Sequence, residues 1–346
     1  MTSDATRPRV TRLAPSPTGR MHLGHAWSFL IAWAVARRSG WRVVLRLEDL
    51  DAQRVHREAE ADTRWMLEWL GIDWDGEAVR QSERIEWHME CMRTLEAKGL
   101  IFEAPHSRSE LRAFRDSDRD AVVSNAAVAT RDVNDGAEAP HEGDDVLRFP
   151  ASLRPPRDRW RFIDRSVNHR LALDAGEERV HDEVFGTQSH DPAALWGDPL
   201  VWLKAGSASY QLAVVADDIS QGVTDVIRGS DLLPSAALQQ RLHALLGAQA
   251  GAVPRWWHLP LVRDAAGKRL AKRHDALSIA GLAERGATAD RIRGAVACWL
   301  GAIGTLQELT REAFLQFDME RIVRDLRART GACRVNGAIE AWLVAR

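Results

Sequence analysis

The sequence predicts an α/β protein with a core built on a parallel sheet, an inserted α+β subdomain and a short helical C-terminal region. Residues 9–51 carry the pattern of a buried strand, a buried helix and a second buried strand, which is typical of a βαβ unit. Another apolar run that ends in acids lies at 209–218, and mainly helical patterns follow residue 272. The chain has 346 residues and is 45% hydrophobic, enough for one large domain with insertions or for two domains.

The first βαβ unit is the clearest local pattern. Residues 9–16 indicate a buried strand that ends in a turn. Residues 26–38 are apolar around most of the helical circumference, which indicates a buried helix, and Gly40 ends it. Residues 41–51 indicate a second buried strand with Glu48 and further acids at its end. Because ligands of parallel sheets bind at the carboxyl ends of the strands, we expect the site there.

The remaining elements follow in order. Helical patterns cover residues 59–70 and 84–98, and short strand-like pieces come after them. The run SYQLAVVADD at 209–218 is predicted as a strong strand, which residues 222–233 continue. Residues 234–248 predict a helix.

These patterns divide the chain into four parts. They are the first half of the sheet core, an inserted subdomain, the second half of the core and a helical C-terminal region, at 1–103, 104–198, 199–275 and 276–346. Within the inserted subdomain, residues 115–145 are polar, acidic and rich in turn residues. That composition predicts a mobile loop or an insertion.

Composition excludes several classes of protein. The net charge of −2, from 47 basic and 49 acidic residues, indicates no global attraction to nucleic acid, although a local basic face is enough to contact phosphates. Three scattered cysteines, Cys91, Cys298 and Cys333, predict neither a disulfide framework nor a cysteine-rich metal site. Because no signal peptide or membrane-spanning run is present, we expect a soluble, cytoplasmic protein with no membrane partner.

The tetrapeptide HLGH, residues 22–25, stands at the expected start of the first helix. A helix N-terminus offers unpaired N–H groups and partial positive charge, which suit a phosphate. Gly24 allows a nucleotide close to the backbone, and His22 and His25 can donate to phosphate oxygens as charge develops. The alternative is that both histidines are ordinary loop and cap residues.

A basic run, GKRLAKRHD at residues 267–275, is the second feature. A lysine on a flexible loop can approach a polyphosphate as a point charge, and Lys272 is the candidate. The alternative is a solvated basic loop.

Together, HLGH and KRLAK resemble the HIGH and KMSKS pair of the class I aminoacyl-tRNA synthetases. RLAPSPTGRMHLGHA, RLEDLD, SYQLAVVADD, GVTDVIRGSDLL and KRLAKRHDALSI resemble the glutamate-specific branch of that family. VFGTQSHD, GDPLVWLK and the short region after residue 275 are similar to its short paralogues, the glutamyl-Q tRNA(Asp) synthetases, which lack the anticodon-binding domain. The resemblance implies a Rossmann-type nucleotide-binding catalytic core.

The resemblance also implies an activity. A ligase of this kind activates L-glutamate with ATP to glutamyl-adenylate without needing tRNA. It then transfers the glutamate to queuosine in the anticodon of tRNA(Asp). Mg²⁺ is expected to accompany ATP, because it bridges phosphate oxygens. The implied oligomeric state is a monomer.

Site residues follow by the same resemblance. Arg12 and Arg228 contact glutamate, Glu48 pairs with the ammonium, and Tyr210 contributes a hydroxyl. The segment after Arg12 supplies further substrate contacts, from Leu13, Ala14, Pro15 and Ser16. ATP is bound by His22, Gly24, His25 and Lys272, of which His22, His25 and Lys272 are the catalytic candidates. Outside these motifs, each residue would be read as a surface ion pair, a strand-end charge or a core aromatic.

One departure from the family concerns zinc. The positions that match its zinc ligands are Ala104, His106, Phe149 and Leu153. Only His106 can bind zinc, and one imidazole does not make a tetrahedral site, so no structural zinc is expected. Packing of Phe149 and Leu153 is the hypothesis for what replaces the metal.

Three alternatives remain open. The nearest is a truncated glutamyl-tRNA synthetase that charges a tRNA 3′ end. A small-molecule nucleotidyltransferase shares the HxGH pattern, but RLEDLD and LAKRHD argue against it. A non-catalytic RNA-binding paralogue is disfavoured by the presence of His22, His25 and Lys272.

Overall fold

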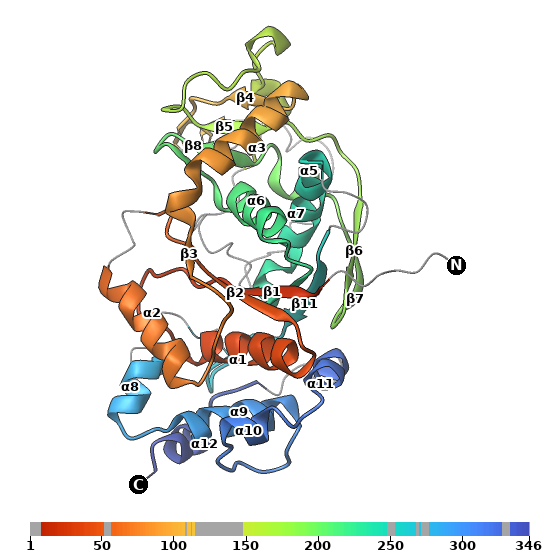
Figure 1. The fold of residues 1–346 in the computed structure, drawn as a ribbon. Helices are drawn as coiled ribbons and strands as arrows, with labels where there is room; N and C mark the ends of the chain where they lie inside the picture. Colours follow the sequence, from red (N-terminus) through yellow and green to blue (C-terminus); the bar gives the residue numbers. More distant parts are fainter. Residues whose placement is uncertain are drawn as a thin grey trace.

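The computed structural model describes residues 8–51, 57–107, 109–111, 113–114, 148–247, 253–267, 270, 277–326 and 333–345 (Figure 1). The predicted loop at 115–145 and the candidate Lys272 lie outside the described residues. The described residues form a seven-stranded sheet and a four-stranded sheet.

The larger sheet has the order β3-β2-β1-β10-β11-β6-β7. Its strands are β3 (Val79–Arg80), β2 (Arg42–Leu47), β1 (Val10–Leu13), β10 (Asp225–Gly229), β11 (Arg255–Leu259), β6 (Glu178–Asp182) and β7 (Gly186–His190). All of its neighbouring strands pair in parallel, except that β7 runs antiparallel to β6. The smaller sheet is antiparallel and consists of β4 (Ile101–Glu103), β5 (His169–Leu171), β8 (Leu200–Leu203) and β9 (Ser207–Ala208).

Helices cover both faces of the larger sheet (Figure 1). The N-terminal helices are α1 (Leu23–Arg38), α2 (Arg57–Trp69) and α3 (Ile85–Ala97). The central helices are α5 (Pro192–Trp196), α6 (Tyr210–Gln221) and α7 (Leu233–Leu245). The C-terminal helices are α8 (Ile279–Glu284), α9 (Ala289–Leu300), α10 (Arg311–Phe314), α11 (Met319–Arg324) and α12 (Gly337–Leu343). On one face α1 packs on β1, β2 and β10, with α9 and α11 behind it, and α6 and α7 lie on the other.

The strand order reverses beside β1. The chain passes from β1 through α1 to β2 on one side, and it returns much later as β10 on the other side. Ligands of open parallel sheets bind outside the carboxyl ends of strands at such a reversal. The fold therefore places the expected site at the ends of β1, β2 and β10.

Side chains alternate strictly between the two faces of these strands. The α1 face is mainly apolar and contributes to the largest core cluster, through residues that include Leu13, Leu45, Ile227, Trp257 and Leu259. The opposite face carries a row of buried polar side chains, from β2 to β11 Arg46, Arg12, Arg228 and His258. Because α6 and α7 cover that face, these polar groups meet helical partners instead of water.

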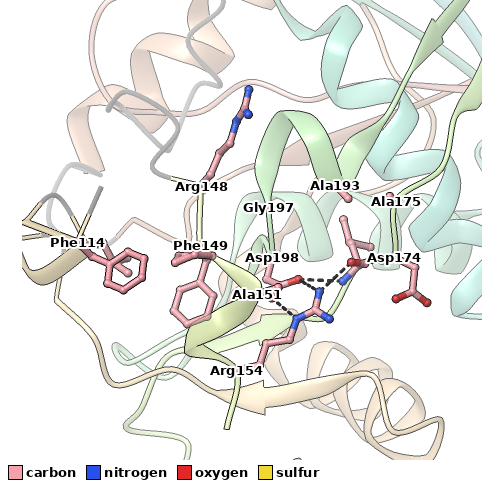
Figure 2. A pocket seen from close by; sticks show the side chains of 13 residues that line it. Phe114, Arg148, Phe149, Ala151, Arg154, Asp174, Ala175, Ala193, Gly197 and Asp198 are labelled. Carbon is pink, nitrogen blue, oxygen red and sulfur yellow. Dashed lines mark hydrogen bonds and ion pairs between the residues drawn. The ribbon is translucent and has the colours of Figure 1, made fainter. Parts of the chain in front are cut away.

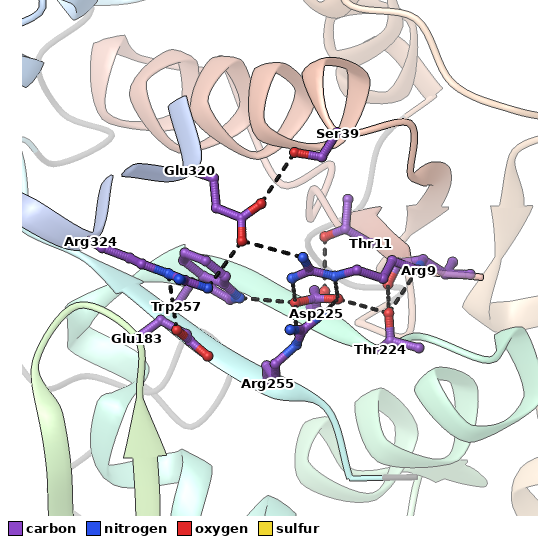
Figure 3. A network of polar contacts seen from close by, with 11 residues as sticks. Arg9, Thr11, Ser39, Glu183, Thr224, Asp225, Arg255, Trp257, Glu320 and Arg324 are labelled. Carbon is purple, nitrogen blue, oxygen red and sulfur yellow. Dashed lines mark hydrogen bonds and ion pairs between the residues drawn. The ribbon is translucent and has the colours of Figure 1, made fainter. Parts of the chain in front are cut away.

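The amino ends of the strands are held by a second polar cluster (Figure 3). Asp225 is fully buried, and its carboxylate accepts from Arg9 Nε at 3.0 Å and from Trp257 Nε1 at 3.0 Å. Arg255 Nε lies 3.1 Å from the same group, and Arg9 also reaches Glu320 of α11 at 3.4 Å. This cluster ties the C-terminal helices to the end of the sheet opposite the expected site.

One predicted element is wrong. Residues 209–218 were expected as a strand, but residues 210–218 lie in α6. Ser209 stands at its N-cap in extended conformation, and Gly222, with φ of +67°, ends it. A short apolar run is compatible with either a buried strand or a buried helix. Here the run forms a helix that packs against α3, α7 and β8.

The predicted strands and helices named next are confirmed. The strands expected at 9–16, 41–51 and 222–233 are β1, β2 and β10, and the helices expected at 26–38, 59–70, 84–98 and 234–248 are α1, α2, α3 and α7. The region after 276 is mainly helical where it is described.

Candidate active site

The residues expected at the glutamate site come together where three strands end. Arg12 lies in β1, Glu48 follows β2, Arg228 lies near the end of β10, and Tyr210 begins α6. All four are buried, between 4% and 8% exposed. Buried ionisable groups that converge at the carboxyl edge of a parallel sheet are typical of a ligand site.

The segment between β1 and α1 contributes unequally. Leu13 is buried in the core cluster on the α1 face, so its side chain points away from the polar row. The carbonyl of Pro15 accepts from the backbone N–H of Glu48 at 2.9 Å, and Ser16 Oγ lies 3.4 Å from Glu48 Oε2. Ala14 is half-buried within this same turn. The turn therefore lies directly against the candidate ammonium partner.

Glu48 is a buried carboxylate beside two buried cations. Its Oε1 lies 3.8 Å from Arg46 and forms no hydrogen bond with the described residues. Burial raises the pKa of Glu48 to about 7, although the charges of Arg46 and Arg12 act to lower it. A carboxylate in this state gains from a bound ammonium, which would supply the missing partner.

Arg46 was not among the predicted site residues. It is fully buried and donates to Asp218 Oδ1 and to Gln221 Oε1, both at 2.8 Å. Burial acts to lower its pKa, but the carboxylates of Asp218, Asp217 and Glu48 outweigh this, and the pKa is raised. The sequence feature that could have pointed to Arg46 is its position between two leucines in a mainly apolar strand.

Arg12 shares Asp218 with Arg46. Arg12 Nε lies 3.6 Å from Asp218 Oδ1, and Arg12 donates to the carbonyl of Ile227 at 3.5 Å. Asp218 is the helical residue that the incorrect strand prediction had placed at a strand end. Its carboxylate therefore balances two buried guanidinium groups.

Among the described residues, the hydrogen-bond acceptors of Arg228 are all uncharged. Its guanidinium donates to His258 Nε2 at 3.0 Å, to Gln239 Oε1 at 2.7 Å and to the Leu232 carbonyl at 3.1 Å. Burial lowers the pKa of Arg228 and outweighs the charges of Tyr210, Asp218 and Asp231, which act to raise it, while the nearby charge of Arg12 also lowers it. A buried cation without an opposing carboxylate among its hydrogen-bond partners favours an incoming anion.

Tyr210 completes this group. Burial raises the pKa of Tyr210 to about 12, with the charge of Glu48 acting in the same direction. The hydroxyl therefore stays protonated at neutral pH and can donate a hydrogen bond.

The HLGH segment caps α1. His22 is the N-cap residue, and its Nδ1 accepts from the backbone N–H of Gly24 at 3.0 Å. His25 Nδ1 accepts from the backbone N–H of His22 at 3.1 Å, so the two histidines form a reciprocal capping box. With Nδ1 as acceptor, each neutral ring carries its proton on Nε2. Capping and phosphate contact are therefore compatible roles for these rings.

The chain that follows the predicted KRLAK loop lies beside HLGH. Ile279 donates its backbone N–H to the Met21 carbonyl at 2.8 Å, and Ser278 forms a β-bridge with His22. The described residues thus join the two segments that carry the motifs, while Lys272 itself lies outside them.

The positions that match the family's zinc ligands form an apolar cluster. Phe149 and Ala104 are buried together with Phe102 and Trp160, and Leu153 packs at the edge. The ring of His106 contacts Phe149 edge-on at 5.6 Å between centroids. These residues do not fit a zinc ion, because only one offers a ligand atom.

A cavity of about 690 Å³ adjoins this apolar cluster (Figure 2). Phe149 and Phe114 line it together with Arg154, which pairs with Asp198 through two hydrogen bonds of 2.7 and 2.6 Å. None of the site residues predicted from the sequence lines this cavity.

In the described part of the chain, none of the helices has the length and apolarity required to traverse a bilayer.

Comparison with known proteins finds similar sequences and a similar solved structure. A glutamyl-Q tRNA(Asp) synthetase from Nitratidesulfovibrio vulgaris is 37% identical over 84% of this chain and 86% of its own length. Glutamate–tRNA ligase 1 from Jannaschia sp. is 37% identical over 85% of this chain but only 56% of the ligase. The structure of a glutamate–tRNA synthetase from Elizabethkingia anophelis shares the fold, with a TM-score of 0.74 at 23% identity over 97% of this chain and 70% of that one.

The family of class I tRNA synthetases (E and Q), catalytic domain, matches residues 9–332. That range contains both motif segments, all three strands of the site and the helices behind them. From this match and from the relatives, the chain belongs to the class I tRNA synthetases of the E and Q group, a family of aminoacyl-tRNA synthetase ligases.

Proposed function

We propose that this chain activates L-glutamate with ATP to form glutamyl-adenylate without tRNA, and then transfers the glutamate to queuosine in tRNA(Asp). The observation that carries the first step is the charge pattern at the carboxyl edge of the sheet. Arg228 is buried with uncharged hydrogen-bond acceptors, and Glu48 is buried with an oxygen that has no hydrogen-bond partner in the described part of the chain. A molecule with two carboxylates and one ammonium offers an anion to Arg228 and a cation to Glu48.

Residue roles follow from position. Arg12 and Arg228 hold carboxylates, because a guanidinium presents a planar fork of donors. Glu48 takes the ammonium, and Tyr210 donates from the start of α6. The adjacent turn, Leu13 to Ser16, shapes the site through its backbone and Ser16.

ATP binds at the start of α1 in this proposal, with Mg²⁺ on its phosphates. An oxygen of the glutamate α-carboxylate forms a bond to the α-phosphorus. The bond from that phosphorus to the bridging oxygen breaks, and pyrophosphate leaves with the electron pair. His22, His25 and Lys272 stabilise the negative charge that develops, and Gly24 allows the close approach. No covalent enzyme intermediate is required, because rate comes from alignment and charge stabilisation.

Transfer to queuosine is supported by the relatives. The chain matches most of the length of several glutamyl-Q tRNA(Asp) synthetases, including 86% of the Nitratidesulfovibrio vulgaris protein and 98% of the Rhodobacter capsulatus protein. The second candidate is a truncated glutamyl-tRNA synthetase that charges a tRNA 3′ end, because glutamate–tRNA ligases match at similar identity.

The deciding experiment is ATP–pyrophosphate exchange with each amino acid in turn, without tRNA. We expect exchange with glutamate alone. Transfer of labelled glutamate is then measured with tRNA(Asp) that contains queuosine and with tRNA(Glu). Transfer to tRNA(Glu) and not to tRNA(Asp) would contradict the proposed acceptor and favour the second candidate, a truncated glutamyl-tRNA synthetase.

A variant pair tests the role of Lys272. Lys272→Ala is expected to abolish most of the exchange while circular dichroism and thermal unfolding stay unchanged. The control is Lys204→Ala, which removes an exposed lysine from the turn after β8. Near-normal exchange by Lys272→Ala would refute the assignment.

A further inference from the structure

His258 is the neighbour of Arg228 on the adjacent strand of the sheet. It lies in β11, directly opposite Arg228 of β10 in the parallel register, and its side chain is fully buried. Its Nδ1 lies 2.7 Å from Asp182 Oδ2, and its Nε2 lies 3.0 Å from Arg228 Nε. The imidazole therefore bridges a buried carboxylate and the proposed substrate-binding cation.

Asp182 is fixed by three backbone groups as well. Its Oδ1 accepts from the N–H groups of Val184 at 3.0 Å and Phe185 at 2.7 Å, and its Oδ2 accepts from the N–H of His258 at 3.0 Å. All of these groups donate, so Asp182 acts as an acceptor toward His258 too. The carboxylate therefore cannot rotate without losing hydrogen bonds in a buried site.

These contacts select one tautomer of His258. An acceptor at Asp182 requires the proton on Nδ1, and the N–H of Arg228 requires a lone pair on Nε2. A protonated imidazole would place N–H against N–H at Arg228. Burial lowers the pKa of His258 to about 4, which agrees with a neutral ring at physiological pH.

The orientation of Arg228 depends on this lone pair. A guanidinium has five N–H groups. Nε donates to His258, and one N–H from each terminal nitrogen donates to Gln239 or Leu232. Within the residues that the structure describes, that leaves one N–H on each terminal nitrogen for a ligand. The ring of Trp256 lies 5.1 Å from the guanidinium carbon and limits tilting of the plane.

We propose that Asp182 and His258 form a positioning pair that holds Arg228 in the orientation that receives a substrate carboxylate. The pair acts through tautomer selection: Asp182 holds the proton on Nδ1, and the Nε2 lone pair fixes Arg228. Neither residue touches the substrate. This inference rests on the proposed function, because the pair orients a residue of the proposed glutamate site.

Two substitutions of His258 separate its contact with Arg228 from its contact with Asp182. In His258→Gln the amide oxygen can occupy the place of Nε2 and accept from Arg228. In His258→Asn the amide can replace Nδ1 as donor to Asp182, but nothing accepts from Arg228. We expect the KM for glutamate in ATP–pyrophosphate exchange to rise roughly 10- to 100-fold in His258→Asn, since small misplacements cost this much. It should return to within a few-fold of wild type in His258→Gln, with the KM for ATP unchanged in both.

His181→Asn is the matched control, because His181 is exposed on the strand that carries Asp182. It should leave both KM values unchanged. Equal KM values for glutamate in wild type and His258→Asn would overturn the proposal, as would a rise of equal size in the Asn and Gln variants.

A spectroscopic readout does not depend on activity. Nitrogen NMR of histidine-labelled wild-type protein, with the His258 signal assigned by comparison with the His258 variants, should show a protonated Nδ1 and a bare Nε2. Asp182→Asn should disturb this pattern, because its amide N–H₂ cannot accept. A wild-type His258 protonated on Nε2 would overturn the proposal whether or not glutamate is the substrate. If wild type shows the expected tautomer but no glutamate-dependent exchange, the proposed function is refuted and the tautomer of His258 is not.

Discussion

Gly24 lies against the ring of His22 so closely that a β-carbon at position 24 would stand 2.9 Å from Cε1 and 3.0 Å from Nδ1 of that imidazole. The same Nδ1 accepts the hydrogen bond from the Gly24 N–H. Real β-carbons are essentially never found closer than 3.0 Å to such an atom. Glycine at this position therefore allows His22 to cap α1. This role is separate from the close approach of a nucleotide that Gly24 is also expected to allow.

Gly24→Ala is expected to displace the His22 ring and to lower the rate of ATP–pyrophosphate exchange by roughly 10- to 100-fold. The comparison is Gly304→Ala, where an added β-carbon meets open space. Measured side by side with thermal unfolding, the control should keep the wild-type rate. Equal rates for the two variants would show that the His22 cap has no bearing on catalysis.

Glu48→Gln is expected to stabilise the protein without ligand at alkaline pH. The folded protein retains the Glu48 proton up to about pH 7, whereas the unfolded chain releases it near the ordinary value of 4.5. Ionisation therefore lowers the free energy of unfolding as the pH rises between these values, by about 3 kcal/mol at most. Urea unfolding should show the variant more stable than wild type at pH 8 and similar at pH 4. The exposed Glu90→Gln should show no such difference.

Glutamate binding is expected to weaken as the pH falls through about 7. Below its raised pKa, Glu48 is neutral and loses its attraction for the ammonium. The Kd for glutamate, measured by calorimetry, should increase toward tenfold per pH unit below that value. Tyr210→Phe retains Glu48 and should keep the same pH profile. A flat profile between pH 6 and 8 would argue against Glu48 as the ammonium partner.

Arg46→Met is expected to lower the free energy of unfolding by about 3–5 kcal/mol, because it leaves Asp218 and Glu48 with fewer opposing charges in a buried site. The matched control is Arg42→Met, at the exposed start of the same strand, with an expected change within about 0.5 kcal/mol. Urea unfolding at neutral pH measures both. A loss no larger than that of the control would mean that Arg12 alone balances the acids.

Apolar packing, rather than zinc, is expected to hold the β4 region. Metal analysis of protein prepared without chelators should find less than stoichiometric zinc, and chelators should leave the melting temperature unchanged. Phe149→Ala should cost about 3–5 kcal/mol, because Phe149 is buried against Phe102. Stoichiometric zinc would refute this view.

Local signals predicted most of the elements. The helix at HLGH and the strands that carry Arg12 and Arg228 were readable, because periodicity, caps and turn residues act over a few residues. Residues 209–218 show the limit of such signals. Their apolar run fits a strand or a helix, and packing of α6 against α3, α7 and β8 decided it.

The sequence by itself determined the order of the motifs, the βαβ start of the core and the chemistry expected of the residues within it. Only the tertiary structure decided which polar groups meet. Asp218 lies beside Arg12 and Arg46 because α6 packs on their face of the sheet, and His258 lies beside Arg228 because β11 pairs with β10 in register. Strand pairing and helix packing join distant parts of the chain, and they depend on burial of whole surfaces, which no short pattern encodes.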